Sequence, residues 1–138
     1  MPTNASEAYL RTQILTAPPE KLQLMLYEGA LRFAGQAKEN LLAKRYEQSC
    51  ELLIRAQGIM VELMSGLRHD VNPDMCGKIS SVYSFIYRRL VDANMKRDAG
   101  AIDDAVKVLT IQRDIWLALL DRLALERAAE PSGASMHA

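Results

Sequence analysis

The chain has 138 residues, with 17 basic and 17 acidic side chains and a formal net charge of zero at pH 7. This length corresponds to one domain that can bury its own core. The balanced charge gives no overall attraction to nucleic acid, so we expect no such partner. No apolar run approaches the ~20 residues that cross a bilayer, and the first residues lack the features of a signal peptide. We therefore expect a cytoplasmic protein without membrane insertion.

Local chemistry marks where helices begin and end along the chain. Pro19 suits a first helical turn, because a proline there loses no hydrogen bond. Glu20 follows it and places a negative charge at the positive end of the helix dipole. Further on, Asn72 precedes a proline and therefore disfavours helical backbone. Residues 98–100 (Asp-Ala-Gly) are typical of a turn.

These signals divide the chain into four helical segments of similar length. The predicted helices cover about residues 19–43, 45–67, 73–97 and 101–127. Because short connections join them, the pattern predicts an all-α, antiparallel up-down four-helix bundle. We expect residues 16–127 to form this bundle, residues 1–15 to form a short N-terminal cap segment, and the turn-rich residues 128–138 to form a disordered tail.

The two cysteines are expected to be reduced. If the second and third helices form an antiparallel hairpin, Cys50 and Cys76 are ~20 Å apart along the bundle at about 1.5 Å per residue. A disulfide needs Cα atoms within about 7 Å. We therefore interpret both residues as small, buried apolar side chains.

The later helices carry more apolar residues than a bundle core needs. With ~100° of rotation per residue, each has one apolar seam that suffices for a core. The predicted core seams are Tyr46, Cys50, Leu53, Gln57, Met60, Met64 and Leu67; Met75, Ile79, Val82, Tyr83, Ile86, Leu90 and Ala93; and Ile102, Ala105, Leu109, Trp116, Leu119, Leu120 and Leu123. The surplus rows beside them are Leu52, Ala56, Ile59 and Leu63; Tyr87 and Val91; and Val108, Ile111 and Ile115.

Two interpretations of the surplus rows remain open from the residues alone. The rows could widen the core stripes or be covered by a short fifth element. Alternatively, they could line grooves that bind an apolar partner. The N-terminal segment can combine both, because its apolar residues could lie over one groove until a partner displaces them. These candidate lid residues are Tyr9, Leu10, Ile14 and Leu15.

Residues that could carry catalysis or bind a metal are sparse. The two histidines, His69 and His137, have no metal-ligand spacing. No nucleophile elbow or phosphate-binding loop is present, and the predicted seams contain no paired carboxylates. We therefore predict no catalytic residue, metal ligand or cofactor, and no enzyme. In the basic pair Arg88 and Arg89, the stem of Arg89 should pack near the core while its head pairs with a carboxylate or a helix end. We assign Gly29 to close helix packing.

The segment from Thr16 to Phe33 reads TAPPEKLQLMLYEGALRF. It resembles the start of the first long helix in the flagellin export chaperone family, the FliS proteins, where T-A-S-P-E-K-L precedes M-L-Y-D/E-G-A-x-R-F. The matching positions are Thr16, Ala17, Pro19, Glu20, Lys21, Leu22, Met25, Leu26, Tyr27, Glu28, Gly29, Ala30, Arg32 and Phe33. Pro18 departs from the family's serine, which would cap the helix. Residues 51–57 and 62–65 resemble the family's second helix and residues 83–94 its third, so the resemblance covers roughly residues 8–123.

The resemblance implies a cytoplasmic export chaperone. Such a protein would bind the disordered C-terminal segment of flagellin in apolar grooves, prevent premature polymerisation and keep the client competent for secretion. It also implies the flagellar export machinery as a further partner. The alternative is a self-associating helical adaptor. A stable dimer that hides the surplus rows would favour the adaptor, and a monomer that gains mass only with flagellin would favour the chaperone.

Overall fold

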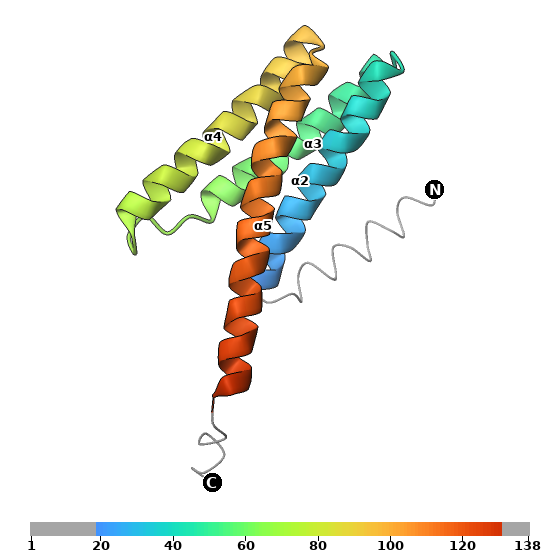
Figure 1. Cartoon of the computed structure of the whole chain (residues 1–138). Coiled ribbons are helices and arrows are strands. Elements are labelled where there is room, and N and C mark those ends of the chain that lie inside the picture. Colours follow the sequence, from blue (N-terminus) through green and yellow to red (C-terminus); the bar gives the residue numbers. More distant parts are fainter. Residues whose placement is uncertain (1–18, 131–138) are drawn as a thin grey trace.

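The structure is a computed structural model that describes residues 19–130. This part of the chain forms the helices α2 (Pro19–Leu42), α3 (Tyr46–Ser65), α4 (Pro73–Lys96) and α5 (Ala99–Ala129). Consecutive helices run in opposite directions, and α2 and α4 each pack against both α3 and α5 (Figure 1). The predicted all-α antiparallel four-helix bundle is confirmed, and each helix end lies within two residues of its prediction. The predicted cap segment, residues 1–15, lies outside the described residues.

Small side chains on the core side of α2 bring this helix close to its neighbours. Ala30, Ala34 and Ala37 are completely buried, and Gly29 is buried beside them. A β-carbon at Gly29 would lie 3.2 Å from Cδ1 of Ile59 on α3, which is tighter than ordinary van der Waals contact. The assignment of Gly29 to close helix packing is therefore confirmed. The largest fully buried side chains are Leu53, Met60, Tyr83, Ile86, Leu90, Ile102 and Leu109.

The core face of α3 is rotated relative to the predicted seam. The buried residues of α3 are Ser49, Leu53, Ala56, Met60 and Leu63, whereas Tyr46 is 37% exposed. Ser49 is buried at no cost in hydrogen bonding, because its Oγ donates to the carbonyl of Ala37 at 2.9 Å. The prediction missed this face because Ser49 and Ala56 contribute little to an apolar pattern. In the structure their small side chains allow α3 to approach the alanines of α2. Ala56 and Leu63, which were predicted to line a groove, are therefore core residues.

The second half of α5 leaves the bundle. Its buried residues end at Leu109, and the last turns of α5 extend beyond the other helices (Figure 1). The prediction that Leu119 belongs to the core is wrong, since this side chain is 42% exposed. Two contacts hold this half near the start of α2. Nε1 of Trp116 donates to the carbonyl of Glu20 at 2.8 Å, and Arg127 approaches the Glu20 carboxylate at 3.6 Å.

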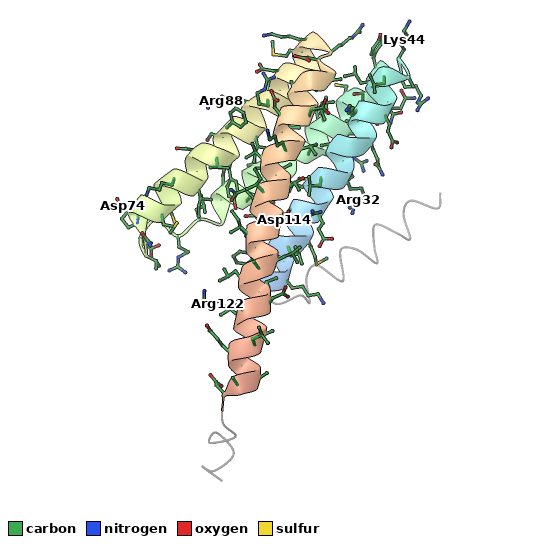
Figure 2. All side chains as sticks on the ribbon, viewed as in Figure 1. Arg32, Lys44, Asp74, Arg88, Asp114 and Arg122 are labelled. Atoms are coloured by element: carbon green, nitrogen blue, oxygen red, sulfur yellow. The ribbon has the colours of Figure 1, made fainter. Side chains whose placement is uncertain are left out.

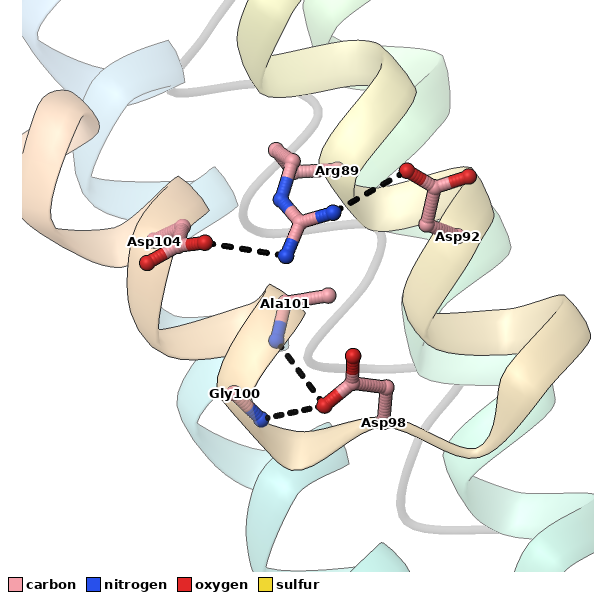
Figure 3. Close-up of polar contacts among 6 residues, drawn as sticks. All are labelled: Arg89, Asp92, Asp98, Gly100, Ala101 and Asp104. Atoms are coloured by element: carbon pink, nitrogen blue, oxygen red, sulfur yellow. Dashed lines mark hydrogen bonds and ion pairs between the residues drawn. The ribbon is translucent and has the colours of Figure 1, made fainter.

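The α4–α5 connection is closed by polar contacts (Figure 3). Oδ1 of Asp98 accepts hydrogen bonds from the backbone nitrogens of Gly100 and Ala101 at 2.9 and 3.3 Å. Residues 99 and 100, predicted as a turn, therefore form the first turn of α5 with Asp98 as its N-cap. Arg89 bonds to Asp92 at 3.1 Å and to Asp104 on α5 at 2.9 Å, as predicted for its head group.

Both cysteines are free thiols, which confirms the prediction that they do not pair. Cys76 is buried, as expected. Cys50 is only half-buried, so the prediction of burial is wrong for this residue. The rotation of α3 explains the difference, because it brings Ser49 into the core and moves Cys50 to its margin.

The cap of α5 yields a stability prediction. Asp98→Ala should lower the free energy of unfolding by ~1 kcal/mol, because two backbone N–H groups lose their acceptor. Urea unfolding followed by circular dichroism would measure the change. Asp121→Ala, an exposed position in the same helix, is the control and should change stability by less than ~0.5 kcal/mol. Equal losses in the two variants would contradict the assigned cap.

Candidate functional site

An apolar pocket of about 320 Å³ opens between α2 and α3. Most of its lining comes from α2, where side chains three or four residues apart project from the same face. Its lining residues are Leu22, Met25, Leu26, Glu28, Gly29, Arg32, Phe33 and Ile59. Because Gly29 has no side chain, Ile59 of α3 can lie directly against the α2 backbone. We refer to this site as the α2/α3 pocket.

A second pocket of about 480 Å³ lies at the open end of the bundle. The axes of α4 and α5 diverge toward this end (Figure 1). Met75 and Ile79 line it from α4, and Ile115, Trp116 and Leu119 line it from α5. The pocket exists because α5 continues past its last buried residue, where Trp116 packs against the core edge while Ile115 and Leu119 remain exposed. We refer to it as the end pocket.

A shallow depression of about 290 Å³ connects the two pockets around the first turns of α2. It shares Leu22 and Leu26 with the α2/α3 pocket, and Gln23 and Gly66 with the end pocket. The three concavities are therefore neighbours along the start of α2, and the depression between them is part polar, since Gln23, Glu62 and Ser65 also line it. Pro19, the first described residue, lines the depression, so the N-terminal segment joins the bundle there.

The floor of the end pocket contains a hydrogen-bonded polar triad. Nε2 of Gln23 donates to the hydroxyls of Tyr27 and Tyr83, each at 3.1 Å. The two tyrosine hydroxyls also bond to one another, and their rings lie 6.3 Å apart, tilted by 57°. Burial, reinforced by the hydrogen bond with Tyr27, holds the pKa of Tyr83 far above its ordinary value. The triad joins α2 to α4 below the pocket.

The structure separates the residues predicted from the surplus rows. Ile59 lines the α2/α3 pocket, while Ile115 and the edge of the buried Leu63 line the end pocket. Ala56 is completely buried in the core and lines neither. The remaining candidates lie on the bundle outside both pockets: Leu52, Tyr87, Val91 and Val108 are half-buried, and Ile111 is exposed. The candidate lid residues lie outside the described residues: Tyr9, Leu10, Ile14 and Leu15.

Sequence reasoning missed several residues that line the pockets. Met25 and Phe33 belong to the segment that resembles a known family, but they had no assigned role in binding. Met75, Trp116 and Leu119 were assigned to the core. Trp116 packs against the edge of the core and bonds to α2, whereas Met75 and Leu119 have a helical angle that suits a core position but remain exposed at the open end.

The described residues offer surfaces for non-covalent binding. Between residues 19 and 130, no three His, Cys, Asp or Glu side chains gather as a metal site would require. None of the helices in this range is long and apolar enough to cross a membrane. Two apolar pockets joined by a shallow depression match the shape that an extended, apolar polypeptide segment would occupy.

Comparison with known proteins gives consistent matches. The family model described as "Flagellar protein FliS" matches residues 2–122. The chain is 35% identical over 113 residues to the flagellar secretion chaperone FliS of Bacillus subtilis, covering 82% of this chain and 84% of that protein. It is 29% identical to the protein of the same name from Campylobacter jejuni, covering 81% of this chain and 88% of that protein. It is 26% identical to that from Salmonella typhimurium, covering 80% and 83%.

A solved structure supports the fold. The crystal structure of a flagellar chaperone from bacteria superposes with a TM-score of 0.71 and covers 88% of this chain and 99% of that chain. The two sequences are 24% identical. At this level of identity the likeness concerns the arrangement of the helices.

The polar triad yields a pH-dependent prediction. Tyr83→Phe should destabilise the fold by at least ~1 kcal/mol near pH 8, because the hydrogen bonds of its hydroxyl with Gln23 and Tyr27 are lost. Since the pKa of Tyr83 is raised in the folded state, its stabilising contribution is complete below the ordinary tyrosine pKa of about 10 and is lost as the pH rises above it. Urea unfolding of both proteins at about pH 8 and about pH 10.5 should therefore show a smaller difference at the higher pH.

Tyr87→Phe serves as the control for this measurement. The Tyr87 hydroxyl makes no hydrogen bond to another residue in the described range, so its removal should change stability near pH 8 by less than ~0.5 kcal/mol. A Tyr83→Phe protein as stable as the parent near pH 8 would contradict a structural role for the triad.

Proposed function

The chain belongs to the FliS family of flagellar secretion chaperones, and on this basis we propose that it binds the C-terminal segment of flagellin in the cytoplasm. Binding would prevent premature polymerisation and keep the client competent for secretion. The observation that carries the proposal is the row of neighbouring concavities, two apolar pockets and the depression between them, from the α2/α3 pocket to the end pocket. This row suits an extended client that lies across several helices.

The proposed mechanism involves no covalent step. Apolar side chains of the client occupy the two pockets, and the chain between them crosses the shallow depression. A disordered segment that orders on binding loses conformational entropy, which offsets part of the free energy gained from apolar burial. The bound client can therefore be released again at the flagellar export machinery, which is the second partner in this proposal. Many shallow contacts suit such release better than one deep cavity.

The N-terminal segment is proposed as a lid on the same concavities. It precedes Pro19, which lines the depression between the pockets. In this proposal residues 1–15 form a separate segment that covers the concavities with Tyr9, Leu10, Ile14 and Leu15 until the client displaces them. Residues 16–127 then act as the binding bundle; of the predicted disordered tail, residues 128 and 129 belong to the last turn of α5.

The residues predicted from the helical pattern contribute unequally to the proposed site. Ile59 and Ile115 are the primary contacts, because each lines a pocket and is at least partly exposed. Leu63 borders the end pocket from the core and is only 2% exposed. Ala56 is excluded by its complete burial. The client would reach further contacts where it extends beyond the pockets: Leu52, Tyr87, Val91, Val108 and Ile111.

Self-association is the second candidate function. The exposed apolar side chains on the second half of α5, among them Ile115 and Leu119, favour it. Two copies that pair stably through this half would be a dimer in the absence of flagellin, and would cover the residues of α5 that line the end pocket. Light scattering of the protein alone and of its mixture with flagellin separates the two functions.

The first functional prediction concerns direct binding. Calorimetric titration of the protein with the C-terminal segment of flagellin from the same organism should give one-to-one binding with a negative heat-capacity change, because apolar surface is buried. Light scattering should then show a monomer that gains mass only in the mixture. No heat and no change in mass on mixing would reject the chaperone function in favour of self-association.

The second functional prediction concerns the pockets. Ile59→Asp and Ile115→Asp should each weaken flagellin binding by at least ~10-fold, because a carboxylate would occupy an apolar site. Ile54→Asp is a matched control, since Ile54 is 55% exposed, close to the 58% of Ile115, and lines neither pocket. The control should bind flagellin as the parent does.

Circular dichroism must show unchanged helicity in all three variants. Loss of the fold in the Ile59 variant would place this residue in the core instead of the site. Equal binding by the Ile54 and Ile115 variants would show that the end pocket is not used.

A further inference from the structure

Two arginines from different helices gather around one aromatic ring at the edge of the α2/α3 pocket. Cζ of Arg32 on α2 lies 5.4 Å from the centre of the Phe33 ring, and Cζ of Arg55 on α3 lies 5.8 Å from it. Arg32 and Phe33 also line the pocket itself. The apolar cavity is therefore bordered by two positive charges that one ring holds in place.

Neither charge is neutralised within the described part of the chain. Arg32 and Arg55 are both exposed, and neither forms an ion pair with another residue between 19 and 130. Arg89 shows the contrast, because it bonds to two carboxylates. Glu28, the acidic residue that lines the pocket, pairs with neither arginine. Two like charges beside one ring repel each other, and a carboxylate would relieve this repulsion.

We propose that the α2/α3 pocket recognises a polypeptide segment in which a large apolar side chain is flanked by aspartate or glutamate. The apolar side chain enters the cavity between Met25, Phe33 and Ile59, and the flanking carboxylates bind the guanidinium groups of Arg32 and Arg55. The proposal deepens the proposed function, because it states which part of the client would occupy this pocket.

The chemistry of arginine supports this assignment. A guanidinium group presents several N–H donors in one plane and can bind a carboxylate through two parallel hydrogen bonds. Contact with the Phe33 ring restricts both groups before the partner arrives, so less conformational entropy is lost on binding. The cavity supplies apolar burial, while the arginines favour one sequence pattern over other apolar segments.

The first test compares charge variants with flagellin as the probe. The double variant Arg32→Gln with Arg55→Gln should bind the C-terminal segment of flagellin ~10-fold more weakly and with a smaller salt dependence, since two charge-assisted contacts are lost. Arg88→Gln is the matched control, because Arg88 is an exposed arginine of α4 that lies well apart from Arg32 (Figure 2). This control should bind as the parent does.

The second test does not depend on flagellin. Short peptides with one leucine between two aspartates, and matching peptides with asparagines, are blocked at both ends so that only side chains supply carboxylates. Titration is followed through the chemical shift of the Ile59 methyl groups. The parent should prefer the aspartate peptide, and the double arginine variant should lose this preference.

The outcomes distinguish this inference from the proposed function. Flagellin binding that is unchanged in the double arginine variant would overturn the inference and leave the chaperone function intact. An equal response to the aspartate and asparagine peptides would overturn it whether or not flagellin binds. Absence of flagellin binding by the parent, together with a retained preference for the aspartate peptide, would reject flagellin as the client and support the recognition of acidic apolar segments.

Discussion

The close approach of α2 and α3 through small side chains is the constraint on which the rest of the structure depends. Ala30, Ala34 and Ala37 are completely buried on α2, and they face a helix whose core side contains Ser49 and Ala56. Because these side chains are short, the larger residues beside them cannot enter the contact and remain at its edge. The α2/α3 pocket is therefore a consequence of core packing, because it lies beside the contact that joins the two helices.

A second consequence follows from the unequal lengths of the helices. α5 has 31 residues, whereas α3 has 20. α5 therefore extends beyond the other helices at the end of the bundle where the α3–α4 connection lies (Figure 1). The opposite end is closed by Arg89, which joins α4 to α5, and by Arg97, whose guanidinium lies 3.8 Å from the centre of the Tyr46 ring. The bundle is thus fixed at one end and open at the other. The end pocket and the depression beside it both lie at the open end.

Much of this architecture could be predicted from the sequence, because it depends on local signals. Pro19, the Asn72-Pro73 pair and the turn near Asp98 mark helix ends through backbone chemistry, and the ion pairs of Arg89 follow from a long charged side chain beside a core seam. The α3 seam could not be predicted, since a pattern that counts apolar residues undervalues Ser49 and Ala56. The open end was missed for a different reason. Helical angle indicates which way Met75 and Leu119 point, but not whether another helix covers them.

The same reasoning separates the residues that stabilise the bundle from those that line the proposed binding site. The alanines and the large core side chains hold the helices together, while Met25, Phe33 and Arg32 project from the same helix into the pocket. Gly29 is the exception that serves both. An alanine there would favour the helix by ~1 kcal/mol, but its β-carbon would lie 3.2 Å from Cδ1 of Ile59 and would push that side chain toward the pocket. Glycine at this position therefore gives up helix propensity to keep the pocket open beside a tightly packed core.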